Sequence, residues 1–256
     1  MKFMLRIDCH THILPRHMPR WTERFGGGKF IHLEDGSSSS SARMMQGTRF
    51  FREVEANCWD AQLRKAEYAA LGTQVQVVCT IPVMFNYDAP TDQSLQIAQF
   101  LNDHIAELVE ADPRHYVGLA SVPLQDTEAA IKELKRCKSM GLRGVQIGSN
   151  INDLNLSEEQ FFPFFEECAN SGMAVMIHPW DMMGKDQMEK YWLPWLVGMP
   201  AETARAASSL IFSGTLERLP NLRVMFSHAG GSFLKLWADS NMASIAVQTW
   251  SPLTIP

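Results

Sequence analysis

The sequence predicts an α/β fold of the TIM-barrel (β/α)8 type, incomplete, with a small lobe inserted after the first strand. Three observations support this. The chain has 256 residues, and one such barrel needs about 250. Short apolar runs alternate with amphipathic stretches along most of it. About six such runs occur, whereas a closed barrel has eight strands.

The apolar runs predict buried strands, because they are short and are bounded by turn residues. They lie at residues 5–8, 75–80, 116–122, 144–148, 174–178 and 223–228. Amphipathic stretches at 61–71, 91–111, 126–140, 157–171 and 201–219 predict helices, several opening on a Thr, Asp or Ser that can cap them. Strands alternating with helices favour a parallel sheet, wound as a barrel or doubly wound.

Two segments depart from this alternation within what we interpret as one domain, residues 1–256. Residues 14–58 are polar and rich in Gly and Ser, notably at 26–28 and 37–41, which predicts an inserted lobe over the mouth of the barrel. Residues 235–256 form a divergent tail without strand or helix periodicity. Two more strand–helix units, about 60 residues, would be needed to close the barrel, so we expect a truncated one.

Composition excludes several classes of function. A net charge of −5 and an apolar fraction of 46% do not indicate a disordered chain, a nucleic-acid binder or a membrane protein. No glycine-rich nucleotide-binding motif follows a predicted strand. We therefore expect a cytosolic protein acting on a small molecule. The five cysteines are scattered without CxxC spacing, which predicts reduced, buried thiols.

Four histidines follow the predicted strands. His10 and His12 end the first strand, where alternation of an extended backbone points both to one side. His178 ends the fifth strand and His228 the sixth. Each alone is more simply a core or loop residue, but the carboxyl ends of barrel strands meet at one face, where active sites form. The other histidines, which lack such placement, are interpreted as surface or lobe residues: His17, His32, His104 and His115.

Such a cluster suits a metal. Imidazoles with a carboxylate are typical ligands of catalytic zinc (Zn2+), although Mn, Fe and Co accept similar ligands. Asp8 and Asp181 are the neighbouring carboxylates. We interpret both as structural residues or as groups that orient a ligand, rather than as direct ligands.

This arrangement of histidines resembles the metal-dependent amidohydrolase superfamily. Longer words resemble, within it, the 2-amino-3-carboxymuconate-6-semialdehyde decarboxylases of tryptophan (kynurenine) catabolism, and the resemblance runs from Leu5 to Phe233. These words are IDCHTHILP at 7–15, PVMF at 82–85, GVQIG at 144–148, HPWDM at 178–182 and YWLPWLVGMPAET at 191–203.

The resemblance implies a zinc-dependent carboxy-lyase that releases CO₂ without oxidation, and a homodimer. It implies that the zinc ligands are His10, His12 and His178, and that His228 is the catalytic residue. It also implies that Arg52 binds a substrate carboxylate and that Trp195 lines the pocket.

Without the resemblance these last residues have plainer interpretations. Trp180, Trp192 and Trp195 would be core packing and Arg52 a surface residue. The pair Met182-Met183 and Phe85 are expected to fill space at the mouth of the site.

The sequence departs from the family after His228. The family's last zinc ligand, an aspartate ending the eighth strand, has no counterpart here, and Asp239 is the only acid in the remaining chain. An arginine that serves the neighbouring subunit is replaced at Trp237-Ala238-Asp239. An alternative transcript or an incorrect gene model would produce such an ending. We therefore expect this chain alone to be inactive or nearly so.

Two alternatives remain at this stage. One is a hydrolase of the same superfamily; many of these hold two metals bridged by a lysine on the fourth strand, where this sequence has Gln146. A single metal is therefore favoured. The other is a non-catalytic truncated form that pairs with a full-length subunit and modulates its activity.

Overall fold

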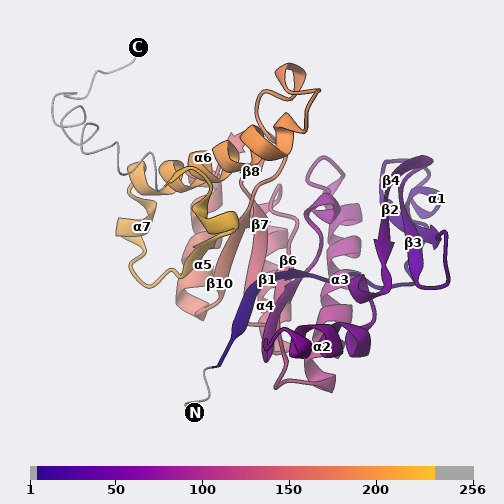
Figure 1. Ribbon diagram of the computed structural model, residues 1–256. Coiled ribbons are helices and arrows are strands. Elements are labelled where there is room, and N and C mark those ends of the chain that lie inside the picture. Colours follow the sequence, from indigo (N-terminus) through magenta and orange to yellow (C-terminus); the bar gives the residue numbers. More distant parts are fainter. Residues whose placement is uncertain (1–4, 234–256) are drawn as a thin grey trace.

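A curved parallel sheet forms the centre of the molecule (Figure 1). The computed structural model describes residues 5–233, and within them this sheet has six strands in the order β1-β5-β6-β7-β10-β11. The strands are β1 (Ile7–His12), β5 (Val75–Cys79), β6 (Tyr116–Ser121), β7 (Gly144–Gly148), β10 (Ala174–His178) and β11 (Val224–Phe226). Spatial order follows chain order, as in a barrel, whereas a doubly wound sheet reverses it. The incomplete-barrel prediction is confirmed.

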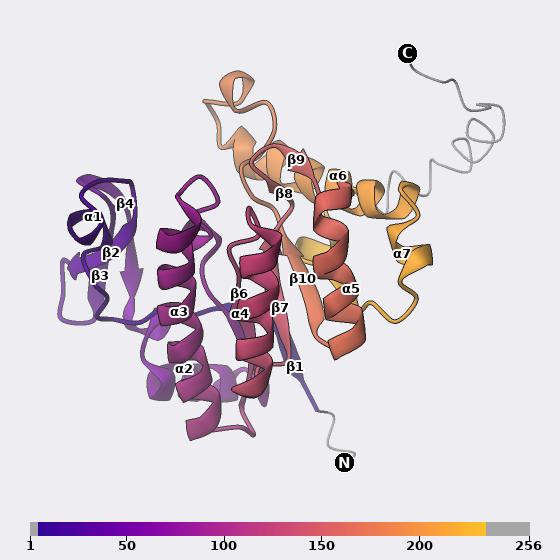
Figure 2. The same cartoon turned by 180° about the vertical axis from the view of Figure 1, so that it is seen from behind.

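Helices connect the strands and cover the outer face of the sheet (Figure 2). The main ones are α2 (Ala61–Ala70), α3 (Thr91–Ala111), α4 (Thr127–Ser139), α5 (Phe162–Ser171) and α6 (Met199–Phe212). One is capped as predicted: the carboxylate of Asp126 accepts the N–H of Ala129 at the start of α4. Asp60 caps α2 in the same way, accepting the N–H groups of Gln62 and Leu63. No helix within residues 5–233 has the length and apolarity of a membrane span.

Several predicted boundaries were wrong. The helix expected at 157–171 begins at Phe162, after a 3-10 turn at Glu159–Phe161. The helix expected at 201–219 is divided into α6 and α7 (Thr215–Arg218), because Gly214 adopts a left-handed conformation with φ 74°. The first strand, expected at 5–8, continues to His12, since Thr11 and His12 pair with β5. The sixth strand ends at Phe226, so His228 lies in a short 3-10 turn after it. The predicted tail, 235–256, lies outside the described residues.

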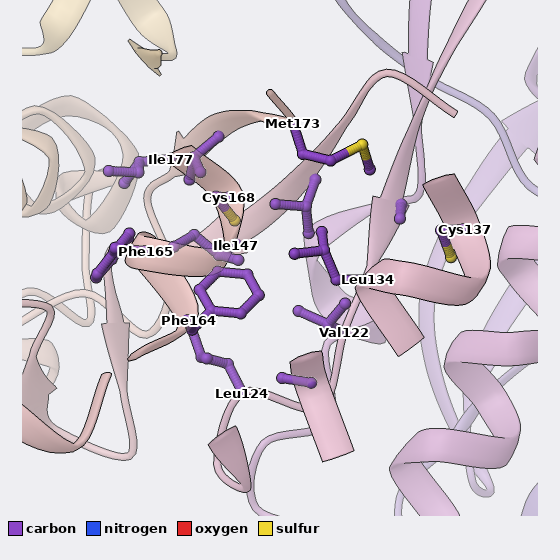
Figure 3. Packing of buried hydrophobic residues seen from close by; sticks show 14 of the residues in the cluster. Val122, Leu124, Leu134, Cys137, Ile147, Phe164, Phe165, Cys168, Met173 and Ile177 are labelled. Carbon is purple, nitrogen blue, oxygen red and sulfur yellow. The ribbon is translucent and has the colours of Figure 1, made fainter. Parts of the chain in front are cut away.

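The main core lies between the sheet and the helices. Phe164 and Phe165 of α5 pack against Ile147 and Ile177, which point outward from β7 and β10 (Figure 3). Full burial of one such side chain contributes about 2–3 kcal/mol. Cys79, Cys137 and Cys168 are buried, but the prediction of buried thiols was wrong for Cys9, which is exposed, and Cys58 is half-buried.

Residues 14–58 contain a three-stranded antiparallel sheet that the sequence did not predict. Its strands are β2 (Ile31–Asp35), β3 (Ser41–Gln46) and β4 (Arg49–Glu55), preceded by α1 (Trp21–Arg24). Trp21, Ile31 and Met44 form an apolar cluster with Ile97 and Leu101 of α3. This cluster fixes the segment beside α3, at one end of the molecule (Figure 1).

The remaining elements are short and lie in connections. They are a hairpin of β8 (Asn150–Ile151) and β9 (Leu154–Asn155), 3-10 turns at Ala56–Cys58, Pro82–Met84, Glu159–Phe161, Lys185–Gln187 and His228–Gly230, and a π-helical turn at Pro194–Gly198.

Candidate functional site

Four histidines meet at the carboxyl ends of β1, β10 and β11. His10 and His12 belong to β1, His178 is the last residue of β10, and His228 follows β11. The ring centroids of His10 lie 4.8 Å from His12, 5.1 Å from His178 and 4.9 Å from His228. Segments more than 150 residues apart in the chain are thus joined, as expected from the strand ends of a barrel.

Three of these rings have the spacing of metal ligands. The ligand nitrogens of His10, His12 and His178 all lie within 4.8 Å of one another. The Nε2 atoms of His10 and His12 are 3.1 Å apart. Two nitrogens on one tetrahedral zinc, each about 2.1 Å from it, would be roughly 3.4 Å apart. The donor set therefore fits a divalent ion.

Backbone carbonyls orient two of the rings. The Nδ1–H of His12 donates to the oxygen of Thr80 at 2.8 Å, and that of His178 to the oxygen of Pro179 at 2.9 Å. A proton held on Nδ1 leaves the Nε2 lone pair free for a metal. The Nε2 of His178 faces the Nε2 of His228 at 3.2 Å, so the fourth ring borders the same space.

Burial keeps the cluster neutral. Loss of solvent lowers the pKa of His12 from 6.5 to about 4, helped by the nearby His10 and opposed by the hydrogen bond to Thr80. It lowers the pKa of His178 to about 2, and lowers those of His10 and His228 as well. At neutral pH these imidazoles are unprotonated, which is the form that binds metals.

A cavity of about 490 Å³ opens beside the cluster. His12 and His178 line it, together with Arg52 of β4 and Trp195 of the π-helical turn. Both residues expected to bind substrate therefore border the same space as two of the expected metal ligands. The remaining lining is mostly apolar: Phe51, Ile81, Pro82, Val83, Pro179, Trp180, Met182 and Pro194, with Asp181 and Lys185.

Lys185 is a lining residue that sequence reasoning missed. It forms an ion pair with Asp181, in the connection after β10. The sequence of this connection has no strand or helix periodicity, so no pattern in it indicated that Lys185 lines the cavity.

The three tryptophans differ in their exposure and contacts. Trp180 packs edge-on against Phe85, with ring centroids 5.6 Å apart. Trp195 is 39% exposed and Trp192 70% exposed. The plain expectation of core packing is therefore wrong for Trp192 and Trp195.

Two polar side chains form hydrogen bonds with the backbone near the histidine cluster. A carboxylate oxygen of Asp8 accepts the backbone N–H of His10 at 3.1 Å. The buried side chain of Gln146 on β7 donates from Nε2 to the oxygen of Thr80 at 3.3 Å, the same carbonyl that orients His12. Its Oε1 has no hydrogen-bond partner among residues 5–233.

The other four histidines take no part in the cluster. His17 is exposed and His32 is buried on β2. His104 lies on α3, and His115 bonds Asp112 at 2.7 Å.

Two proteins named as decarboxylases are similar to this chain over most of its length. It is 52% identical over 230 residues to the 2-amino-3-carboxymuconate-6-semialdehyde decarboxylase of Dictyostelium discoideum, covering 90% of this chain and 64% of that protein. It is 31% identical to the Caenorhabditis elegans protein of the same name, covering 89% and 69%. The chain thus spans less than two thirds of the length of the Dictyostelium relative.

Solved structures show the same fold. The 5-carboxyvanillate decarboxylase of Sphingomonas paucimobilis superposes with a TM-score of 0.69 at 27% identity, over 75% of this chain and 59% of that one. The enzyme of that name from Novosphingobium aromaticivorans, with bound manganese and 3-methoxy-4-hydroxy-5-nitrobenzoic acid, gives 0.75 at 22% identity, over 98% and 75%. The amidohydrolase family model matches residues 7–255. The chain belongs to the amidohydrolase family.

Proposed function

We propose that the site on this chain is that of a metal-dependent decarboxylase that removes CO₂ from 2-amino-3-carboxymuconate 6-semialdehyde, in the kynurenine branch of tryptophan catabolism. The departure from the family after His228 predicts little or no turnover by this chain alone, and the experiment below measures that turnover. The observation that carries the proposal is the placing of Arg52 and Trp195 on the same cavity as His12 and His178. The Dictyostelium and Caenorhabditis relatives bear that activity in their names.

Arg52 holds a substrate carboxylate. Its guanidinium presents parallel N–H groups that match the two oxygens of a carboxylate. Lys185 also lines the cavity, but its charge is paired with that of Asp181, so Arg52 is the proposed partner of the carboxylate. Phe51 and Trp195 offer apolar surface to the conjugated chain. The site thus combines the charge of Arg52 with an apolar lining.

His228 supplies the proton that replaces CO₂. The bond between the carbon chain and the leaving carboxylate breaks, and its electron pair delocalises into the conjugated aldehyde before the carbon takes up a proton. No electron acceptor is needed. Being neutral at pH 7, His228 can take a proton from water and pass it on.

Zinc is the proposed metal, held by His10, His12 and His178. When bound, it polarises water or a substrate oxygen and stabilises negative charge. The chain's own contribution is to keep those three imidazoles neutral and oriented. We further propose a cytosolic enzyme that works as a homodimer, as the resemblance implies.

The test is to purify the chain, measure its metal content, and follow loss of substrate absorbance together with CO₂ release. Zinc and manganese are loaded in parallel, since imidazole ligands accept either. Bound metal with one CO₂ released per substrate consumed supports the proposal. Bound metal with hydrolysis of an amide or lactone and no CO₂ would favour the hydrolase alternative. Absence of both metal and turnover would refute the activity for this chain.

A further inference from the structure

A completely buried carboxylate lies behind the cavity. Glu202, near the start of α6, has a side chain with 0% exposure. It accepts four hydrogen bonds: from Ser149 Oγ at 2.9 Å, Asn150 Nδ2 at 3.2 Å, the backbone N–H of Met183 at 2.9 Å and Arg205 Nη2 at 2.9 Å. These donors come from the segment after β7, the connection after β10, and α6 itself.

Two of these donors, Ser149 and Asn150, also bond an earlier residue of the connection after β10. The backbone N–H of Trp180 donates to Ser149 Oγ at 3.0 Å, and its carbonyl accepts Asn150 Nδ2 at 2.7 Å. Glu202 therefore holds residue 183 directly and residue 180 through two intermediaries. Between them lie Asp181 and Met182, which line the cavity with Trp180.

This connection needs an external restraint. Asp181 has φ 45°, in the left-handed region that a residue with a side chain rarely adopts. Met183 and Lys185, which follow, are exposed. A buried charge with four donors is a strong restraint, because its hydrogen bonds are charge-assisted and shielded from water.

We propose that Glu202 is a positioning residue that fixes residues 180–183 and so sets the shape of the cavity offered to the substrate. It does not belong to the histidine cluster. The part of this inference that concerns substrate rests on the proposed function; the part that concerns residues 180–183 does not.

The chain contains a matched control. Glu133 on α4 is also buried, with 1% side-chain exposure, and pairs with an arginine three residues later, Arg136, at 2.7 Å. It too accepts from an asparagine amide, that of Asn102, at 2.7 Å. Glu133 differs in place: it bonds side chains of α3 and α4 and not the connection after β10.

The experiment compares Glu202→Gln with Glu133→Gln in the full chain. The two carboxylate oxygens of Glu202 both accept hydrogen bonds, whereas glutamine has one oxygen and one NH₂ group. In Glu202→Gln the NH₂ group must therefore face either the N–H of Met183 or the other three donors. Hydrogen–deuterium exchange of peptides covering 179–183 should then rise about tenfold or more, since local opening becomes easier. Glu133→Gln should leave that exchange unchanged.

Ser149→Ala provides a second variant, in case Glu202→Gln fails to fold. It removes the hydroxyl that accepts the Trp180 N–H without exposing a buried charge, and it should raise the same exchange by a smaller factor. Equal exchange at 179–183 in Glu202→Gln and the parent, or an equal rise in Glu133→Gln, would overturn the inference.

Kinetics separate positioning from a general loss of stability. Glu202→Gln should raise KM several-fold with kcat within about twofold and metal content unchanged, because residues 180–182 line the proposed substrate cavity and the histidines are untouched. Glu133→Gln should change neither constant. If the parent chain has no turnover, the proposed function fails, while the exchange measurement still decides the role of Glu202.

Discussion

The floor and the wall of the cavity are held in place by different means. We define the histidine floor as His10, His12, His178 and His228, of which His12 and His178 line the cavity, and the cavity wall as Arg52, residues 180–182 and Trp195. Three floor residues lie in strands, and two of these, His12 and His178, pair with a neighbouring strand and have rings oriented by backbone carbonyls. The wall comes from connections and from the segment 14–58, fixed by side-chain contacts.

Exposure differs within the floor itself. His178 is buried, with 8% exposure, whereas His10 and His12 are half-buried and His228 is exposed. In the wall, Trp180 is half-buried and Trp195 is 39% exposed. The difference between floor and wall therefore lies in what fixes them: strand pairing and backbone carbonyls for the proposed metal ligands, and contacts between connections for the proposed substrate-binding residues.

The largest effect is expected from removing a floor imidazole. His178→Ala should weaken metal binding by more than about a hundredfold, since losing even a group that supports a ligand costs 10–100-fold. Metal content after dialysis measures this. His115→Ala, which removes a histidine outside the cluster, should retain the metal. A full metal complement in dialysed His178→Ala would contradict the assignment of the floor.

Arg52→Gln should affect substrate binding and spare the metal. A hydrogen bond to a charged group contributes about 1.5–3 kcal/mol, so kcat/KM should fall about 10- to 150-fold, mainly through KM. Arg49→Gln is the matched control, because Arg49 lies on the same strand and is absent from the cavity lining. An equal loss in both variants would show that the cavity wall does not include Arg52.

The metal-free floor should make stability depend on pH. The pKa of His12 is lowered to about 4 in the folded chain from 6.5, so between those values the unfolded chain binds more protons. The free energy of unfolding should therefore fall as pH drops from about 6.5 towards 4. Urea unfolding at several pH values measures this, and His12→Asn should flatten the profile. Unchanged stability between pH 7 and pH 4.5 would argue against a buried, neutral floor.

The smallest effect is expected at the exposed part of the wall. Trp195→Leu should raise KM by no more than about fivefold, because a partly exposed ring contributes only part of its area to a ligand. Trp192→Leu should leave KM unchanged, since that ring is more exposed and does not line the cavity. A larger effect at Trp192 than at Trp195 would reverse this assignment.

Sequence reasoning recovered the floor better than the wall. His178 ends an apolar run that any buried strand would show, so its place at the sheet edge follows from local pattern. The strands of segment 14–58 were missed because their polar residues hide the alternation. Glu202 was missed for a similar reason: an acidic residue in the first turn of a helix is ordinary, and nothing local indicates that α6 places it against Ser149, Asn150 and Met183.

The sequence by itself determined the alternation of barrel strands and helices, the incomplete barrel, and which histidines lie at or just after the strand ends, because periodicity and chain order are local properties. Only the tertiary structure decided that Arg52 and Lys185 share a cavity with His12, and that Glu202 bonds Met183 across 19 residues. The physical reason is that the burial of a strand can be predicted from the polarity of adjacent residues in the sequence. A cavity wall depends instead on contacts between segments far apart in the chain, and the sequence pattern does not specify those contacts.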